Sequence, residues 1–114
     1  MKNLIASILM IFVGFTMQSQ DVQPNKNAQY SFEVKGNCEQ CQKRIQKAAM
    51  SVKGVKSAVW DVDSQKINLI LNEEKCNVEE VKKAIAKSGH DTDGVKATEE
   101  DYNNLHHCCQ YDRK

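Results

Sequence analysis

The sequence has no excess of charge of either sign, and it is poor in proline and glycine. Its 16 Lys and Arg nearly balance its 15 Asp and Glu, so the formal net charge is +1. Nucleic-acid-binding proteins present a basic face, so we expect no nucleic-acid partner. One proline and five glycines argue against a low-complexity disordered chain. A chain of 114 residues leaves no room for a second enzyme domain or a long repeat array.

A long apolar run is also missing. The apolar stretch 4–15 follows Lys2 and is about 12 residues long, whereas a membrane-spanning helix needs about 20. It fits the hydrophobic region of a signal peptide, which we place at residues 1–19; a retained N-terminal anchor is the alternative. The polar stretch 20–28 is then a flexible leader. We therefore expect a periplasmic or secreted protein that meets the membrane only through its signal segment.

After the leader, stretches in which apolar residues are spaced by two take turns with stretches in which they are spaced by three and four. Apolar residues spaced by two indicate half-buried strands, and apolar residues spaced by three and four indicate helices. Asn77 and Glu80 stand three apart, as in a capping box at a helix start. The expected elements are a strand around 30–34, a helix over 39–52, strands over 55–62 and 67–71, a helix between Asn77 and Gly89, and a weaker strand within 91–97.

This order, βαββαβ, predicts an α+β fold of the ferredoxin-like type. Two helices would cover one face of a four-stranded antiparallel sheet in a domain spanning residues 29–97. Within the second strand, Ala58, Trp60 and Val62 would share one face. Residues 98–114 form a tail that contains Cys and His, with a possible helix start at Thr98.

The chemistry of the domain centres on Cys38 and Cys41, which stand three apart between the first strand and the first helix. The positive end of a helix stabilises thiolate, and soft thiolates select Cu(I), Zn(II) and similar ions. Two sulfurs suit a linear ion such as Cu(I) or Hg(II), whereas structural zinc takes four ligands. A thioredoxin-type redox pair and a structural disulfide are the alternatives for the same two residues.

These residues carry a resemblance to a known family. The stretch Gly36-Asn37-Cys38-Glu39-Gln40-Cys41, set before a helix and followed by a hairpin and a second helix, resembles the heavy-metal-associated domain of copper chaperones, copper-exporting P-type ATPases and periplasmic mercury-binding proteins. The resemblance implies that Cys38 and Cys41 bind the metal. This chain has one residue fewer before the first cysteine, and it has Asn37 where the family has a methionine that packs beneath the loop.

The tail offers further ligands in the run His106-His107-Cys108-Cys109. If a short helix follows the domain, Cys108 and Cys109 return toward Cys38 and Cys41 and complete a site of three or four thiolates. A disordered tail and a pairing of Cys76 with a tail cysteine are the alternatives. His90 should border the site, either as a further ligand or as a buried turn residue.

The predicted metal ligands are Cys38, Cys41, Cys108 and Cys109. The predicted function is binding, buffering or trafficking of a thiophilic ion, with Cu(I) as first choice and Hg(II) or Zn(II) as others. The expected partner is a membrane metal transporter, either a P-type ATPase or an efflux system. We expect no enzymatic activity, and the alternative function is thiol–disulfide exchange through the same pair.

Overall fold

The computed structural model describes residues 23–113, so the predicted signal peptide 1–19 lies outside the described residues. The elements in chain order are β1 (Ala28–Glu33), α2 (Glu39–Met50), β2 (Val55–Asp61), β3 (Lys66–Leu71), α3 (Val78–Lys87), α4 (Glu99–Asn103) and the 3₁₀ turn η1 (His107–Cys109). No helix in this part of the chain is long and apolar enough to cross a membrane.

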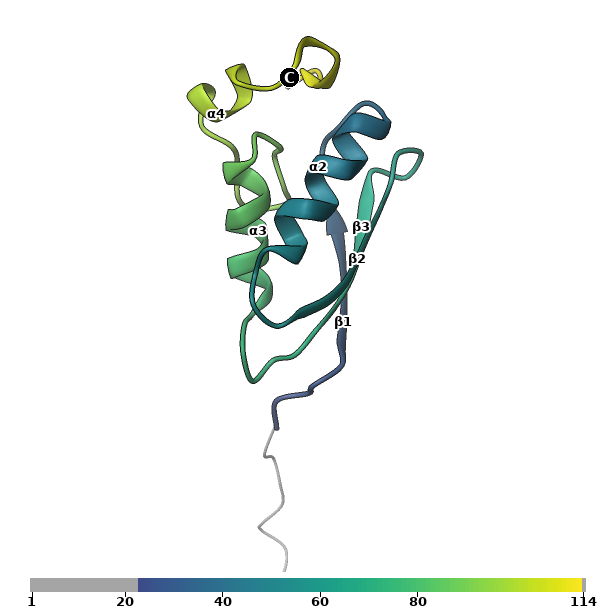
Figure 1. Ribbon diagram of the computed structural model, residues 1–114, viewed down its shortest axis with the longest axis vertical. Helices are drawn as coiled ribbons and strands as arrows, with labels where there is room; N and C mark the ends of the chain where they lie inside the picture. Colours follow the sequence, from purple (N-terminus) through teal and green to yellow (C-terminus); the bar gives the residue numbers. More distant parts are fainter. Residues whose placement is uncertain (1–22, 114) are drawn as a thin grey trace, which may run out of the picture.

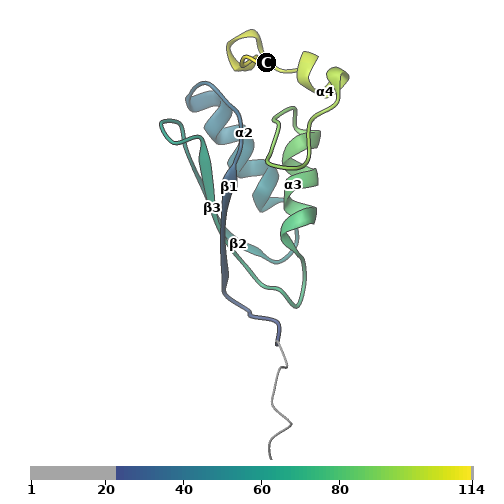
Figure 2. The ribbon, with the colours of Figure 1, turned by 180° about the vertical axis from the view of Figure 1, so that it is seen from behind.

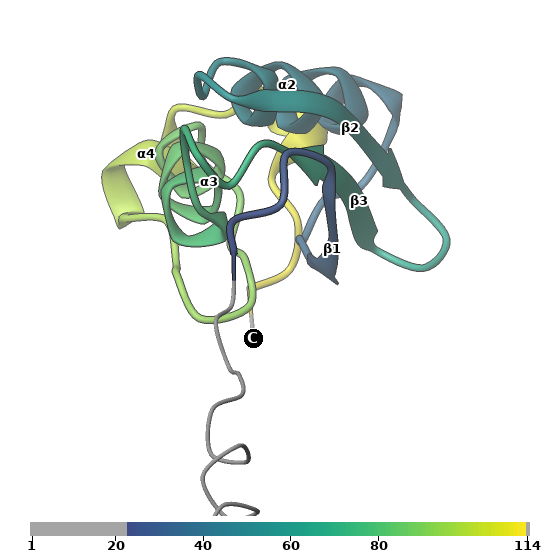
Figure 3. The ribbon, with the colours of Figure 1, turned by 90° about the horizontal axis from the view of Figure 1, so that it is seen from below.

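The strands form an antiparallel sheet in the order β1-β3-β2, with β3 in the centre. Helices α2 and α3 lie together on one side of it (Figures 1 and 2). Figure 3 shows the same elements seen from below, where β2 is drawn across α2. The ferredoxin-like arrangement predicted from the sequence is therefore confirmed.

The expected fourth strand is not formed. Residues near Thr92 run beside the end of β1 only briefly, where Val34 and Thr92 make one antiparallel bridge. The chain then folds back, because the N–H and hydroxyl of Thr92 both donate to the Val95 carbonyl across a turn that contains Gly94 at φ +94°. The described sheet thus has three strands instead of four.

The core lies between the sheet and the two helices. Ile45 from α2, Ile85 from α3, and Ile67 and Leu71 from β3 are all fully buried, as their spacing predicts. The strand expected over 55–62, with Val62 on the same face as Ala58 and Trp60, is one residue too long: β2 ends at Asp61, and Val62 lies beyond it and is 43% exposed.

Two glutamines fasten α2 to the free edge of β2. The side-chain amide of Gln42 donates to the carbonyl of Trp60 at 2.8 Å, and the N–H of Trp60 donates to the Gln46 side chain at 2.9 Å. An edge strand exposes unpaired backbone groups, and here the helix satisfies those of Trp60. This fixes α2, whose N-terminal end carries Cys38 and Cys41, against the sheet.

Candidate metal centre

The loop that leads from β1 into α2 is held by side chains from two other parts of the chain. The side chain of Gln65 accepts from the N–H of Gly36 at 3.1 Å and donates to its carbonyl at 3.0 Å. Nδ1 of His90 is hydrogen-bonded to the carbonyl of Lys35 at 2.8 Å. The loop is therefore fixed on both sides immediately before Cys38.

Trp60 fills the space beneath this loop. Its indole is fully buried and donates to the carbonyl of Val34 at 3.0 Å. A Cβ on Gly36 would lie 3.0 Å from two indole carbons and 3.1 Å from the Cβ of Cys41, closer than ordinary contact. Only glycine lets the loop approach the indole this closely. The sequence pattern predicts Trp60 on a strand but does not link it to the site.

Cys38 and Cys41 converge at the start of α2. Cys38 is the N-cap residue of the helix, and its Sγ lies 3.9 Å from the Sγ of Cys41. The thiol of Cys41 is fully buried and accepts the N–H of Asn37 at 3.3 Å. Hydrogen bonding from the Cys41 N–H is the main cause that lowers the pKa of Cys38, with smaller contributions from the Gln40 N–H and from the Cys41 and Cys108 groups. The Cys38 thiol therefore ionises more readily than an ordinary cysteine to thiolate, the form that binds metal.

The tail lies over these two cysteines. Figure 1 shows the C-terminal segment, in yellow, above the N-terminal end of α2. The Sγ atoms of Cys38, Cys108 and Cys109 all lie within 4.8 Å of one another. The side-chain amide of Asn37 donates to the carbonyl of Cys108 at 3.2 Å, which joins the loop directly to the tail.

The two tail cysteines differ in environment. Cys108 is exposed, whereas Cys109 is fully buried. Burial raises the pKa of Cys109, and the neighbouring Cys41 and Cys108 thiols raise it further. Four thiols that share so little space repel one another once ionised, and a bound cation relieves that repulsion.

The sulfur spacing suits a thiophilic ion. A metal with bonds of about 2.3 Å to sulfur can join two sulfurs up to about 4.6 Å apart. The Cys38–Cys41 separation of 3.9 Å is within that reach. The sulfurs of Cys38, Cys108 and Cys109 lie within 4.8 Å of one another, a group that does not include Cys41. The structure therefore brings all four predicted ligands to one end of the molecule as free thiols.

The other candidates lie apart from this group of sulfurs. Cys76 is buried beside the carbonyl of Asn72, before the first turn of α3, and burial raises its pKa. Because both tail cysteines lie beside Cys38, the alternative in which Cys76 pairs with one of them does not match this structure. His106 and His107 are exposed, and neither belongs to the cluster of three close sulfurs.

His90 is a buried neighbour of the loop. Its side chain is fully buried, its ring stacks on Tyr111 at 5.5 Å, and burial is the main cause that lowers its pKa. Its Nε2 has no hydrogen-bond partner among the described residues. His90 thus connects the loop to the tail, and its burial favours the neutral ring.

The comparisons with known proteins agree with this geometry. Residues 31–91 match the family model of the heavy-metal-associated domain. The chain belongs to that family. It is 31% identical over 55 residues to the copper chaperone CopZ of Staphylococcus haemolyticus, a match that covers 48% of this chain and 81% of that protein.

Solved structures with this fold are similar as well. The CopZ metallochaperone matches with a TM-score of 0.56 and 25% identity over 58% of this chain and 100% of that one. The N-terminal domain of a potential copper-translocating P-type ATPase from Bacillus subtilis matches with a TM-score of 0.55 and 22% identity, over 63% of this chain and 99% of that one. The heavy-metal-associated domain matched here ends at residue 91, so Cys108 and Cys109 lie beyond it.

Proposed function

We propose that this protein binds a thiophilic metal ion, Cu(I) as first choice, through Cys38 and Cys41 together with Cys108 and Cys109. The observation that carries the proposal is the position of the Cys38, Cys108 and Cys109 sulfurs within 4.8 Å of one another, with Cys41 Sγ 3.9 Å from that of Cys38. Sulfur ligands in this number favour Cu(I) or Zn(II) over hard cations. Hg(II) belongs to the same thiophilic class.

The proposed role is buffering or delivery of the ion rather than catalysis. An incoming thiolate from a partner attacks the bound ion while a thiolate of this protein leaves, so neither metal nor sulfur changes oxidation state. Similarity to proteins described as a copper chaperone and as a domain of a potential copper-translocating P-type ATPase supports a membrane transporter as partner. The signal-peptide pattern at residues 1–19 supports a site of action in the periplasm or outside the cell.

A competition titration tests the binding proposal. Reduced protein produced from the full chain competes for Cu(I) with a coloured chelator, alongside the variants Cys38→Ser/Cys41→Ser and Cys108→Ser/Cys109→Ser. We expect the first variant to lose high-affinity binding. The second should bind more weakly, by at least the about tenfold that loss of an outer-shell partner of a metal ligand costs. Cys76→Ser is the matched control and should bind as the original protein does. Undiminished affinity in Cys38→Ser/Cys41→Ser would contradict the proposal.

Thiol–disulfide exchange is the second candidate. It is favoured by one observation, a thiol with a lowered pKa at Cys38 only 3.9 Å from the thiol of Cys41. It predicts a reversible disulfide between Cys38 and Cys41 and catalysed reduction of insulin by dithiothreitol. Cu(I) binding without such turnover would leave metal binding as the function.

A further inference from the structure

The segment that carries Cys108 and Cys109 is fastened to the domain at points that are not cysteines. Helix α4 begins at Thr98, whose hydroxyl accepts the N–H of Asp101. The chain then packs on Gly89, which has φ +107°; a Cβ there would lie 2.8 Å from the Asp101 carbonyl and from two carbons of Leu105. Leu105 is 5% exposed, so the chain is anchored shortly before the two tail cysteines.

A second anchor follows the two cysteines. The hydroxyl of Tyr111 accepts the N–H of Asp91 and donates to the carbonyl of Gly89, both at 2.8 Å. Its side chain is buried, its ring stacks on His90, and Tyr102 donates from its hydroxyl to the carbonyl of Tyr111. Tyr111 therefore satisfies the backbone of the turn that also supports the loop before Cys38.

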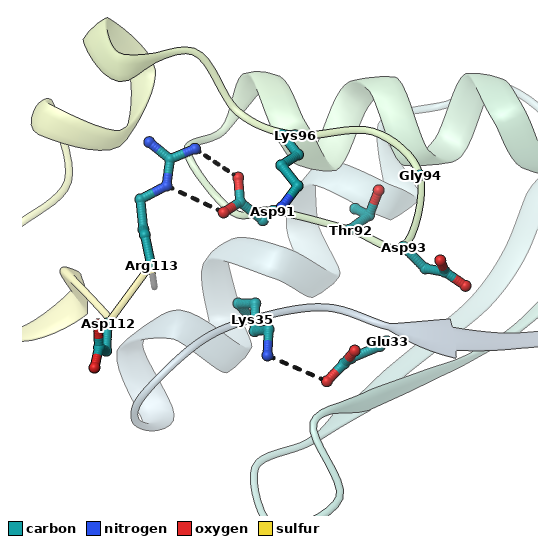
Figure 4. Close-up of a pocket in the computed structure, with 9 residues that line it drawn as sticks. All are labelled: Glu33, Lys35, Asp91, Thr92, Asp93, Gly94, Lys96, Asp112 and Arg113. Carbon is teal, nitrogen blue, oxygen red and sulfur yellow. Dashed lines mark hydrogen bonds and ion pairs between the residues drawn. The ribbon is translucent and has the colours of Figure 1, made fainter.

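Arg113 completes this anchor. Its guanidinium donates to both carboxylate oxygens of Asp91, at 2.8 and 3.1 Å, and to the carbonyl of Ala97 at 2.8 Å. The side chains of Arg113 and Asp91 are 23% and 9% exposed, and the guanidinium lies 4.7 Å from the centre of the Tyr102 ring. Figure 4 shows the forked pair at one side of a polar pocket. Two parallel hydrogen bonds between opposite charges are strong and directional.

The anchors hold the tail sulfurs in place without being able to bind metal themselves. The Arg113 guanidinium has only donors, and the Tyr111 hydroxyl is already engaged with Asp91 and Gly89. If both anchors release, residues 104–113 leave the loop and take Cys108 and Cys109 with them. Local opening of this kind has its own free energy, smaller than that of global unfolding.

We propose that residues 98–113 form a strap that closes over the metal site, and that Tyr111 and Arg113 are positioning residues that set how fast the ion leaves. This inference rests on the proposed function. A closed strap keeps two thiols at high effective concentration beside the ion. An acceptor can then take the ion quickly only from a molecule whose strap is open. The fraction of molecules with an open strap therefore sets the transfer rate.

The test measures Cu(I) transfer from the loaded full chain to excess coloured chelator by stopped-flow absorbance. Arg113→Ala, Arg113→Lys and Tyr111→Phe are each made in the original protein and also in Cys108→Ser/Cys109→Ser. In the original background we expect Arg113→Ala to speed transfer by about tenfold, as for the loss of a charged hydrogen-bonded pair. Arg113→Lys keeps the charge and should restore part of the slow rate. In the serine background none of the three changes should alter the rate.

Two results would overturn the inference. The first is an unchanged transfer rate in Arg113→Ala and Tyr111→Phe. The second is an equal acceleration of Cu(I) transfer in the original protein and in Cys108→Ser/Cys109→Ser. Tyr111 and Arg113 would then act on the stability of the whole domain and not through the tail thiols. Absence of Cu(I) binding by the unsubstituted protein would instead contradict the proposed function. Tyr111→Phe keeps the ring, so it provides a folded variant if Arg113→Ala fails to fold.

Discussion

The sulfur of Cys109 lies within 4.8 Å of the sulfur of Cys38, although the first belongs to the C-terminal tail and the second to the loop after the first strand. Both positions depend on the turn around His90. His90 is hydrogen-bonded to Lys35 in the loop and stacks on Tyr111 in the tail. One buried turn therefore supports both halves of the candidate site, and displacement of either half changes the sulfur spacing.

The thiol of Cys38 should react faster with an alkylating reagent than the thiol of Cys76. We expect iodoacetamide to alkylate Cys38 of the metal-free protein faster than Cys76 near neutral pH, because thiolate is the reacting form. The Cys41 N–H lowers the pKa of Cys38, whereas burial raises the pKa of Cys76. Mass spectrometry of timed digests measures both rates. Equal rates would show that the helix start does not favour thiolate at Cys38.

Trp60→Phe should destabilise the protein and loosen the loop above it. The change leaves the carbonyl of Val34 without its donor and opens space beneath Gly36. We expect the free energy of unfolding to fall by about 2 kcal/mol, measured by urea denaturation of the metal-free protein. The control is Val59→Ala on the same strand, where the side chain is 54% exposed and the expected change is below about 0.5 kcal/mol. Similar losses in the two variants would contradict this account of Trp60.

Asp91→Asn should lower stability in a pH-dependent way. Burial alone would raise the pKa of Asp91, but hydrogen bonds from Arg113 and from the Ala97 N–H lower it below its ordinary 3.8. The unfolded state therefore binds the proton more readily, so the contribution of the ionised carboxylate is complete above the ordinary pKa and is lost as the pH falls through the lowered one. We expect a loss of about 2 kcal/mol at neutral pH that shrinks in acid.

Urea denaturation of the original protein and of Asp91→Asn at several pH values measures this difference. Asn keeps the size of the side chain but replaces one acceptor oxygen by an NH2 donor, so only the pH-dependent part of the difference reports the charge. A difference that stays constant from neutral pH to below the ordinary pKa of 3.8 would show that the ion pair with Arg113 does not stabilise the fold.

The helix starts that the sequence predicts correctly depend on contacts between residues that are close together in the chain. Asn77 accepts the N–H of Glu80 at 2.9 Å and donates its own N–H to the Glu80 side chain at 3.1 Å, so the predicted capping box at the start of α3 is confirmed. Thr98 likewise begins α4 as its spacing suggests. These contacts span three residues, so the pattern of residue types is enough to find them.

Two predictions were wrong because the local sequence pattern suggested a strand where side-chain hydrogen bonds form a turn. The stretch 91–97 contains residues suited to a strand, but Asp91 accepts the N–H of Ala97 at 2.8 Å and the turn at Gly94 draws the chain back. Val62 continued an apolar alternation, yet the side chain of Asp61 accepts the N–H of Ser64 at 2.8 Å and starts the hairpin turn first. In the first place a side chain took a backbone N–H that a fourth strand would have used, and in the second the turn began where β2 ends, at Asp61.

The two-layer α+β fold, the order of its elements from β1 to α3, and the two thiols at the start of α2 follow from the sequence alone, because hydrophobic period, helix caps and the spacing of Cys38 and Cys41 are local properties. Tertiary packing sets where the tail thiols lie, which residue supports the loop, and which contacts hold the strap in place. Those outcomes depend on Trp60 beneath Gly36 and on Arg113 paired with Asp91. Contacts between residues this far apart in the chain exist only after the sheet and helices have packed.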